Sequence, residues 1–297
     1  MNEIVVPSAS GLTPWENRNG RWYKREDLHR NKYGVNGAKY RAARHLMTQA
    51  VLDGYDTVVS AQSVLSPQSP IVATLAEEME LECILVYGAT NPISVVRHRN
   101  VSIAVEAGAM VDTTPRVAYN PVIQPYAAKL AEELGAWQMP YAISPELGGS
   151  QKALQEFLEV GGRQTIHIPE QIETLVIAFG SGNTTAGVLY GLSRFAEHVP
   201  KRVVLVGVGP DRTEWLGDRL EQAGIDTLDF WENIELQHIP LHGWFANYSD
   251  KMPETVDDIV MHPTYEGKVV RFLNESNLDW WHDRDGSVGF WIVGGPL

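Results

Sequence analysis

The chain has 297 residues, of which 44% are hydrophobic and 21% charged, a balance typical of a globular protein with a large core. Its net charge of −13 disfavours a broad surface for non-specific binding of nucleic acid. No apolar run reaches membrane-spanning length, no signal peptide is present at the start, and the single Cys83 excludes disulfides and cysteine-based metal sites within one chain, so we expect a cytoplasmic protein without a metal centre.

Strand-like and helical patterns alternate along the chain. A Lys-Arg-Glu-Asp strand at residues 23–28 leads through a Gly/Asn turn at 34–37 into a helix over 39–52. Later strands are predicted at 57–60, 83–87, 109–111, 175–179, 203–207 and 288–293. Helices are predicted at 69–80, 94–107, 121–134, 152–160, 184–196 and 214–223. Apolar strands that alternate with helices form parallel sheets covered on both faces, so the pattern predicts an α/β fold.

Lys39 stands in the first turn of the helix predicted after the Gly/Asn turn. The helix dipole and the nearby Arg41 and Arg44 would lower the pKa of its ammonium group, which favours a neutral, nucleophilic amine. By itself, however, the pattern fits a solvated lysine at a helix end equally well.

A glycine-rich turn, Gly-Ser-Gly-Asn-Thr-Thr at residues 180–185, joins a predicted buried strand to a predicted helix. Such a turn directs backbone N–H groups and the positive end of a helix dipole to one point, and this suits a phosphate group. The glycine spacing differs from the dinucleotide-binding fingerprint, and no P-loop lysine follows. A structural turn without a ligand is the alternative.

Four ordered segments together resemble the fold-type II pyridoxal-phosphate (PLP) enzymes, relatives of the tryptophan synthase β chain. The segments are the strand and turn that lead to Lys39, the glycine-rich turn, His-Pro-Thr-Tyr-Glu-Gly-Lys at 262–268 and, more weakly, Phe-Trp-Ile-Val-Gly-Gly at 290–295. The likeness is greatest to 1-aminocyclopropane-1-carboxylate (ACC) deaminase and D-cysteine desulfhydrase. It implies two open parallel-sheet domains with the cofactor in the cleft between them: a large domain of residues 1–52 and 150–297 and a small domain of residues 53–149.

The resemblance assigns a role to each part of the site. Lys39 would bind PLP covalently, and the phosphate would be held by Gly180, Ser181, Gly182, Asn183, Thr184 and Thr185. Glu266 would pair with the pyridine nitrogen and keep the ring protonated, because an opposite charge favours the charged form. A protonated ring is a strong electron sink, which favours chemistry through a Cα carbanion over simple β-elimination. Tyr265 would face the substrate as an acid, base or nucleophile, although a turn before a helix would explain both residues as well.

The sequence departs from the family pattern around Ser66. Ser66 would move a proton near Cα, but Pro67 occupies the position of the family's cofactor-binding Asn. These changes predict altered chemistry, a different substrate or lost activity, with Gln62 or Gln68 as replacements for the lost contact.

Two further departures concern the rim of the predicted site. The chain is short between residues 244 and 262, and it stops near residue 297, where relatives continue. We therefore expect an open site that accepts a substrate larger than a free amino acid. Tyr248 is the candidate for the residue that stacks on the cofactor ring.

Three functions remain open. The first is a PLP-dependent lyase acting at Cα of an amino acid, similar to the deaminase and the desulfhydrase. The second is a decarboxylase of an amino acid attached to a larger carrier, such as a hypermodified thymidine in phage DNA, although the net charge disfavours DNA. The third is a non-catalytic PLP-binding protein. In addition, we expect a homodimer with no membrane partner.

Overall fold

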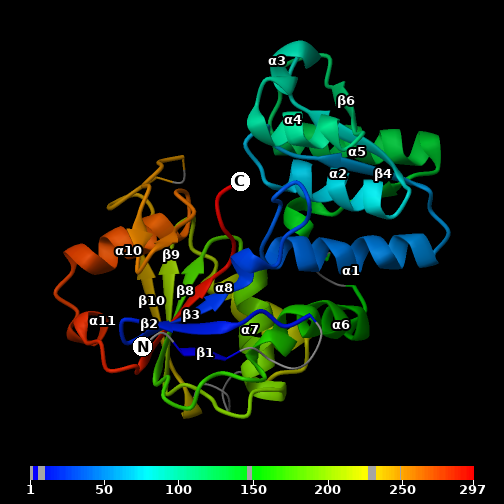
Figure 1. Cartoon of the computed structure of the whole chain (residues 1–297). Coiled ribbons are helices and arrows are strands. Elements are labelled where there is room, and N and C mark those ends of the chain that lie inside the picture. Colours follow the sequence, from blue (N-terminus) through cyan, green and yellow to red (C-terminus); the bar gives the residue numbers. More distant parts are fainter. Residues whose placement is uncertain (1–2, 6–10, 146–148, 227–231, 248) are drawn as a thin grey trace. The chain divides into compact units, whose positions relative to one another are not determined.

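The computed structural model describes residues 3–5, 11–145, 149–226, 232–247 and 249–297 (Figure 1). Contacts between Cα atoms divide the chain into a large unit, residues 1–29, 36–38 and 147–297, and a small unit, residues 30–35 and 39–146. The predicted domain boundaries stay a prediction. In the division by contacts, residues 39–52 lie with the small unit, where the Tyr40 hydroxyl donates to Glu78 at 2.5 Å and Arg44 pairs with the same carboxylate.

The large unit is built on a seven-stranded sheet of order β1-β2-β3-β13-β8-β9-β10. Neighbours among β1, β2 and β3 are antiparallel, whereas β13, β8, β9 and β10 continue parallel to β3. The strands are β1 (Glu3–Val5), β2 (Trp15–Arg18), β3 (Arg21–Arg25), β8 (Thr174–Phe179), β9 (Arg202–Gly207), β10 (Glu235–Pro240) and β13 (Val288–Ile292), and a separate hairpin consists of β11 (Thr255–Val256) and β12 (Ile259–Val260).

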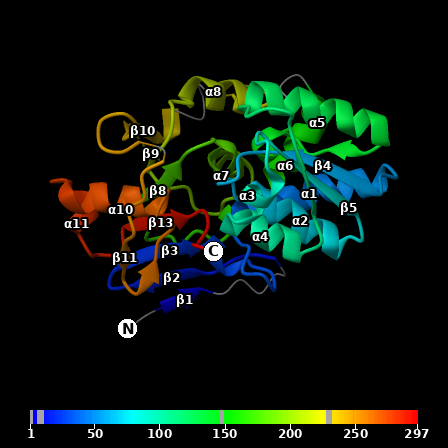
Figure 2. The same ribbon diagram turned by 90° about the horizontal axis from the view of Figure 1, so that it is seen from above.

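Helices cover both faces of this sheet (Figures 1 and 2). They are α6 (Gln151–Gly162), α7 (Asn183–Arg194), α8 (Thr213–Gln222), α10 (Glu266–Glu275) and α11 (Asp279–His282), with short 3-10 turns η1 (Glu26–Leu28) and η3 (Arg163–Thr165). Val176 and Ala178 of β8 pack with Val270 and Leu273 of α10 in one core cluster. The views show α7 on the opposite face, so β8 is covered on both sides, as its continuous apolar sequence predicts.

The small unit contains a four-stranded parallel sheet of order β6-β5-β4-β7. Its strands are β4 (Thr57–Ala61), β5 (Glu82–Tyr87), β6 (Met110–Thr113) and β7 (Trp137–Gln138), and its helical elements are α1 (Ala38–Leu52), α2 (Gln68–Glu78), α3 (Pro92–Val96), α4 (Arg99–Glu106), α5 (Asn120–Leu134) and η2 (Tyr141–Ile143). Val59 and Val86 on one face pack with Ala127 of α5. Ser60 and Tyr87 lie on the opposite face of the sheet and form hydrogen bonds with the start of α2: Gln68 donates to Ser60, and Tyr87 donates to Ser69.

The single helix predicted over residues 94–107 is two helices, α3 and α4. The chain leaves the helical conformation at His98, whose φ of −74° and ψ of 133° are extended. In the part of the chain that the structure describes, no helix is both long and apolar enough to cross a membrane.

Candidate active site

The predicted phosphate turn, residues 180–185, connects β8 to α7. Every residue of β8 is buried, and the chain leaves the sheet at Gly180. Gly182 precedes α7 with a φ of 90°, and a Cβ at this position would lie 2.5 Å from the ring of Trp215. The backbone conformation and the Trp215 ring therefore both require glycine here, with or without a ligand.

The first turn of α7 has the composition of an anion site. It contains no acidic residue, and among the described residues no side chain caps it. The first N–H groups of a helix lack partners within the helix, so they and the positive end of the dipole are directed toward the turn. Ser181 is exposed and Thr184 partly exposed, whereas Asn183 and Thr185 are buried. Two of the four side chains are therefore accessible to a ligand from solvent.

Tyr265 lies beside the phosphate turn, where the chain enters α10. Its ring is tilted by 38° against the ring of His262, with 4.8 Å between the centroids. A Cβ built on Gly180 would lie 3.9 Å from Cε1 of Tyr265, which places the ring next to the turn. Burial and two nearby lysines lower the pKa of His262 to about 4, so the imidazole beside Tyr265 is neutral at pH 7.

Glu266 is fully buried in the first turn of α10. Its Oε1 accepts a hydrogen bond from the N–H of Val293 at 2.8 Å, and its Oε2 has no hydrogen-bond partner among the described residues. Burial raises the pKa of Glu266 to about 8, although backbone N–H groups act in the opposite direction. Oε2 is one of several buried polar atoms without a partner among the described residues, and it is available to a further hydrogen-bonding group.

Val293 connects Glu266 to the segment in front of Lys39. The carbonyl oxygen of Val293 accepts from the N–H of Ala38 at 2.9 Å. Gly37 permits this approach, because its φ is 94° and a Cβ there would lie 2.5 Å from the Val293 oxygen. The residue directly after Ala38 is Lys39, so the start of α1 is attached close to Glu266.

Lys39 is the second residue of α1, and its side chain is partly buried. Burial lowers the pKa of its ammonium group, the direction that the sequence predicted. The cause is desolvation by burial, which the sequence did not reveal, and a contribution of the helix dipole stays a prediction. Arg44 is paired with Glu78. A lowered pKa increases the fraction of neutral amine, which is the form that attacks a carbonyl carbon.

Ser66 is carried by the small unit, in the loop between β4 and α2. Its Oγ accepts from the N–H of Gln68 at 3.2 Å, a local bond typical of serine at the start of a helix. Pro67 is the residue directly before α2, a position where its missing N–H removes no helical hydrogen bond.

The two glutamines proposed to replace the missing Asn are both engaged inside the small unit. The Ser60 hydroxyl donates to Gln62 at 2.7 Å, and Gln68 Nε2 donates to the Ser60 oxygen at 3.0 Å. Both glutamines are buried. A role of either in cofactor binding stays a prediction.

The structure thus brings several predicted site residues together in the large unit: the phosphate turn, Tyr265, Glu266 and the attachment of Lys39. Tyr248 lies outside the described residues. The sequence reasoning missed Val293 and Asn36, whose Oδ1 accepts from the N–H of Gly295 at 2.7 Å. The only sequence signals for them were the glycines beside them.

Comparisons with known proteins show what the chain as a whole resembles. No protein-family model matches the chain. An O-seryl-dTMP PLP-dependent decarboxylase of Salmonella phage ViI is 27% identical, across 92% of this chain and 77% of the relative. A 1-aminocyclopropane-1-carboxylate deaminase of Pseudomonas syringae pv. tomato is 23% identical, across 82% of this chain and 77% of its own. A D-cysteine desulfhydrase of Salmonella newport is 22% identical, across 92% and 86%.

Among solved structures, an ACC deaminase homologue superposes with a TM-score of 0.67 at 23% identity, covering 93% of this chain and 84% of that chain. The resemblance to fold-type II PLP enzymes is confirmed. The predicted α/β fold with parallel-sheet units is confirmed as well, and the antiparallel strands β1 and β2 are an addition to it.

Proposed function

We propose that this chain removes the carboxylate from an amino acid attached to a thymidine nucleotide, with PLP as its cofactor. At the coarser level the chain is a PLP-dependent lyase with an amino-acid-type substrate, because relatives across most of its length are named for such reactions. The decarboxylase is the relative of 27% identity that supports the finer proposal.

The residues of the large unit fit PLP, and Glu266 carries this argument. Its buried Oε2 suits the pyridine nitrogen, and the start of α7 suits the phosphate, since in the described part of the chain neither has a side-chain partner. Lys39 would supply the amine that binds the cofactor covalently, helped by its lowered pKa. These assignments of Lys39, Glu266 and the phosphate turn remain proposals.

PLP, when bound, supplies an electron sink for the pair left at Cα after a bond to it breaks. Before PLP binds, Glu266 would be protonated at pH 7, since burial raises its pKa to about 8. Its Oε2 would then share that proton with the pyridine nitrogen of the cofactor. The α7 amides, with Ser181 and Thr184, would orient the phosphate end. Tyr265, beside the turn, would return a proton to Cα from its hydroxyl.

Decarboxylation suits this set of residues better than elimination or racemisation of an ordinary amino acid does. Loss of CO₂ needs no base to remove a proton from Cα, whereas elimination and racemisation begin with that step in this cofactor's chemistry. ACC has no proton at Cα, so this difference does not separate decarboxylation from deamination of ACC. The hydroxyl of Ser66, the predicted proton carrier, accepts a hydrogen bond from the N–H of Gln68. Pro67 stands where the family pattern has its Asn. The chain therefore retains the electron sink and the proton donor, which are the two functions that decarboxylation requires.

Deamination of an ACC-type amino acid is the second candidate, favoured by the Tyr265–Glu266 pair at the start of α10. Incubation of the PLP-loaded chain with O-seryl thymidine nucleotide, ACC and D-cysteine in parallel separates the possibilities. Release of CO₂ from the nucleotide alone supports the proposal, and release of ammonia from ACC favours the second candidate. Bound PLP without turnover of any substrate would identify a non-catalytic binding protein.

A homodimer and a cytoplasmic location stay predictions. Sedimentation of the purified, PLP-loaded chain tests the first.

A further inference from the structure

The loops that follow the four strands of the small sheet share one edge. Because β4 to β7 are parallel, residues 62–67, 88–91, 114–119 and 139–145 all leave the sheet at its carboxyl end. We call this the carboxyl edge. It includes the Ser66 loop, and ligands of open parallel sheets bind at such edges.

Hydrogen bonds hold the loops of the carboxyl edge together. Asn100, in the first turn of α4, donates to the Leu65 carbonyl at 2.9 Å. The Ala118 N–H donates to the Gly88 carbonyl at 3.2 Å. Asn120, the first residue of α5, donates to the Tyr141 hydroxyl at 2.8 Å. The four loops and the starts of α4 and α5 thus form one connected surface.

The charge of this surface contrasts with that of the chain. The four loops contain no Asp or Glu, and Arg116 is their one charged residue. Arg97, directly after α3, and Arg99, the first residue of α4, are exposed beside them. Among the described residues no acidic side chain forms an ion pair with these three arginines.

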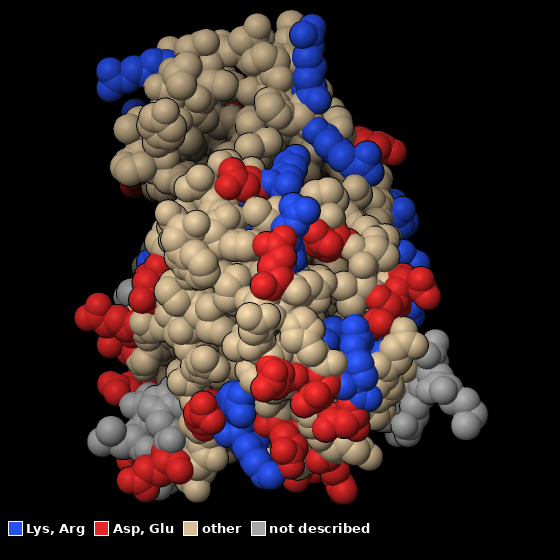
Figure 3. All heavy atoms as spheres, turned by 90° about the vertical axis from the view of Figure 1, so that its left-hand side faces the viewer, with Lys and Arg blue, Asp and Glu red and all other residues tan. Residues whose placement is uncertain are grey.

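The excess of acidic residues belongs to the large unit. The small unit has 9 Lys and Arg against 11 Asp and Glu, whereas the large unit has 15 against 26. Figure 3 shows Lys and Arg at the margin of a largely uncharged face of the small unit, and many Asp and Glu over the large unit. The net charge of −13 therefore does not describe the carboxyl edge.

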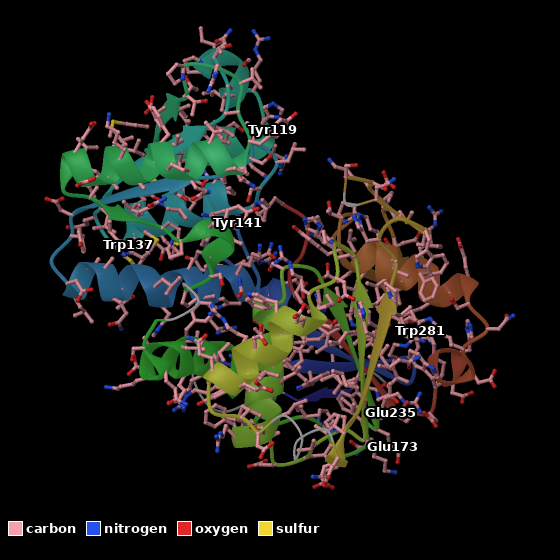
Figure 4. All side chains as sticks on the ribbon, turned by 180° about the vertical axis from the view of Figure 1, so that it is seen from behind. Tyr119, Trp137, Tyr141, Glu173, Glu235 and Trp281 are labelled. Carbon is pink, nitrogen blue, oxygen red and sulfur yellow. The ribbon has the colours of Figure 1, made fainter. Side chains whose placement is uncertain are left out.

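Two tyrosines project from the carboxyl edge. Tyr119 is 83% exposed and Tyr141 is 52% exposed. Figure 4 labels both on the same side of the small unit, away from Trp137 at the start of β7. Val117 and Leu65 on the same loops are also exposed, so aromatic and apolar groups lie among the arginines.

The backbone after Tyr141 is strained. Ala142 and Ile143 have φ of 60° and 57°, a conformation that is rare for any residue with a side chain and a clear outlier for a β-branched one. Ile143 is buried, so its side chain anchors the turn, while Tyr141 remains in solvent with its hydroxyl held by Asn120. Strain of this kind concentrates at functional sites.

We propose that the carboxyl edge binds unpaired bases of DNA next to the modified nucleotide, an inference that rests on the proposed function. Tyr119 and Tyr141 stack on bases, and Arg97, Arg99 and Arg116 contact phosphates. Exposed aromatic rings interleaved with arginines are the combination that single-stranded nucleic acid requires, because every base offers a face for stacking and every linkage a negative charge. An enzyme that acts on a base must remove that base from the duplex stack, which leaves its neighbours accessible.

Fluorescence anisotropy of a labelled, thymidine-rich single strand, titrated with the full PLP-loaded chain at several salt concentrations, tests this surface. Tyr119→Ala and Tyr141→Ala should each weaken binding at least about fivefold. The triple variant Arg97→Gln, Arg99→Gln, Arg116→Gln should reduce the slope of log Kd against log salt by about 2, since each phosphate contact on a single strand contributes about 0.7.

Two variants of the same unit serve as matched controls. Tyr55→Ala removes an exposed tyrosine that precedes β4, at the opposite edge of the sheet, and Lys129→Gln removes an exposed cation on α5. Both should bind the strand as the unmodified chain does. An equal loss in Tyr55→Ala and Tyr119→Ala would overturn the proposal, and so would tighter binding of a duplex than of the single strand.

Turnover of two substrates separates this inference from the proposed function. The same seryl adduct is offered as a mononucleotide and within an oligonucleotide. A lower ratio of oligonucleotide to mononucleotide turnover in Tyr119→Ala supports the surface. Turnover of the mononucleotide without binding of the strand overturns the surface and leaves the decarboxylase intact. Binding through these residues without CO₂ release from either substrate supports the surface and contradicts the decarboxylase.

Discussion

Glu266 combines two properties that a purely structural carboxyl would avoid: full burial and an oxygen without a partner among the described residues. In the ligand-free chain, burial raises its pKa from the ordinary 4.5 to about 8. Between these values the folded chain keeps a proton that the unfolded chain releases. The contribution of Glu266 to stability is therefore fully present below pH 4.5 and is lost as the pH rises to about 8.

We predict that Glu266→Gln removes this loss. The free energy of unfolding of the PLP-free chain, measured by urea denaturation at intervals from pH 4.5 to 8, should decline less steeply in the variant than in the unmodified chain. The comparison must be between the two chains, because His262, with its pKa lowered to about 4, acts in the opposite direction below pH 6.5. In the PLP-loaded chain the same variant should retain cofactor and lose turnover. Parallel pH profiles for the two chains would contradict the assignment.

At the scale of elements, the turn between β8 and α7 offers a test of phosphate binding. Ser181 is exposed, so Ser181→Asp places a negative charge beside the phosphate without filling a packed space. PLP affinity should fall about tenfold or more, equivalent to about 1.4 kcal/mol per tenfold, in a titration followed by absorbance.

Ser181→Asn is the matched control for that variant, because it has the same size and no charge. It should bind PLP nearly as the unmodified chain does. Gly182→Asp is a poorer test, because its Cβ would meet the Trp215 ring at 2.5 Å and disturb the fold as well. Similar affinities for the Asp and Asn variants would show that the turn does not hold the phosphate.

Substitution of two glycines in the segment before α1 tests the cost of backbone strain separately from the cost of a steric clash. Gly34 and Gly37 have φ of 79° and 94°, but a Cβ on Gly34 meets nothing within 4 Å, whereas one on Gly37 would lie 2.5 Å from the Val293 oxygen. Gly34→Ala should cost about 1 kcal/mol of unfolding free energy from strain alone. Gly37→Ala should cost at least about 1 kcal/mol more and should also weaken PLP binding, because it displaces the attachment of Lys39.

Urea denaturation and PLP titration of both glycine variants check this prediction. If the two variants lose the same stability and the same affinity, the contact between Ala38 and Val293 does not position the site.

Elements with a continuous apolar sequence were predicted from the sequence. β8, β9 and β13 lie inside the sheet, where both faces are buried, so four or five hydrophobic residues in a row identify them. β10 was missed because it is an edge strand, only partly buried, and its sequence Glu-Leu-Gln-His-Ile-Pro has no such run.

The site was predicted only where its parts are local in sequence. The phosphate turn and the Tyr265–Glu266 pair each occupy a few consecutive residues, so composition and resemblance located them. The Asn36–Gly295 bond joins residues 259 positions apart, and nothing in either segment predicts the other. The cause of the lowered pKa of Lys39 was missed for the same reason, because burial is a property of the fold.

At the scale of the whole molecule, the residues proposed to hold PLP belong to the large unit, with the exception of Lys39, the first residue of the small unit after residues 36–38. The phosphate turn, Tyr265, Glu266 and residues 36–38 are all in the large unit. We predict that PLP binding slows amide hydrogen exchange in α7, α10 and residues 293–295, and leaves the β4–β7 sheet nearly unchanged. Exchange measured by mass spectrometry with and without PLP checks this, and equal protection of the small sheet would show that the cofactor is held by both units.

The position of β13 in the sheet has a consequence for synthesis of the chain. It is the last strand in sequence, yet it lies between β3 and β8 and pairs with both. As the chain emerges from the ribosome, residues 39–146 can complete the small sheet, while β1–β3 and β8–β10 wait as two separate ribbons with open edges. A ribosome that stalls before residue 288 would leave both edges exposed to pairing with other chains, so the last strand both joins the large sheet and ends its most aggregation-prone period.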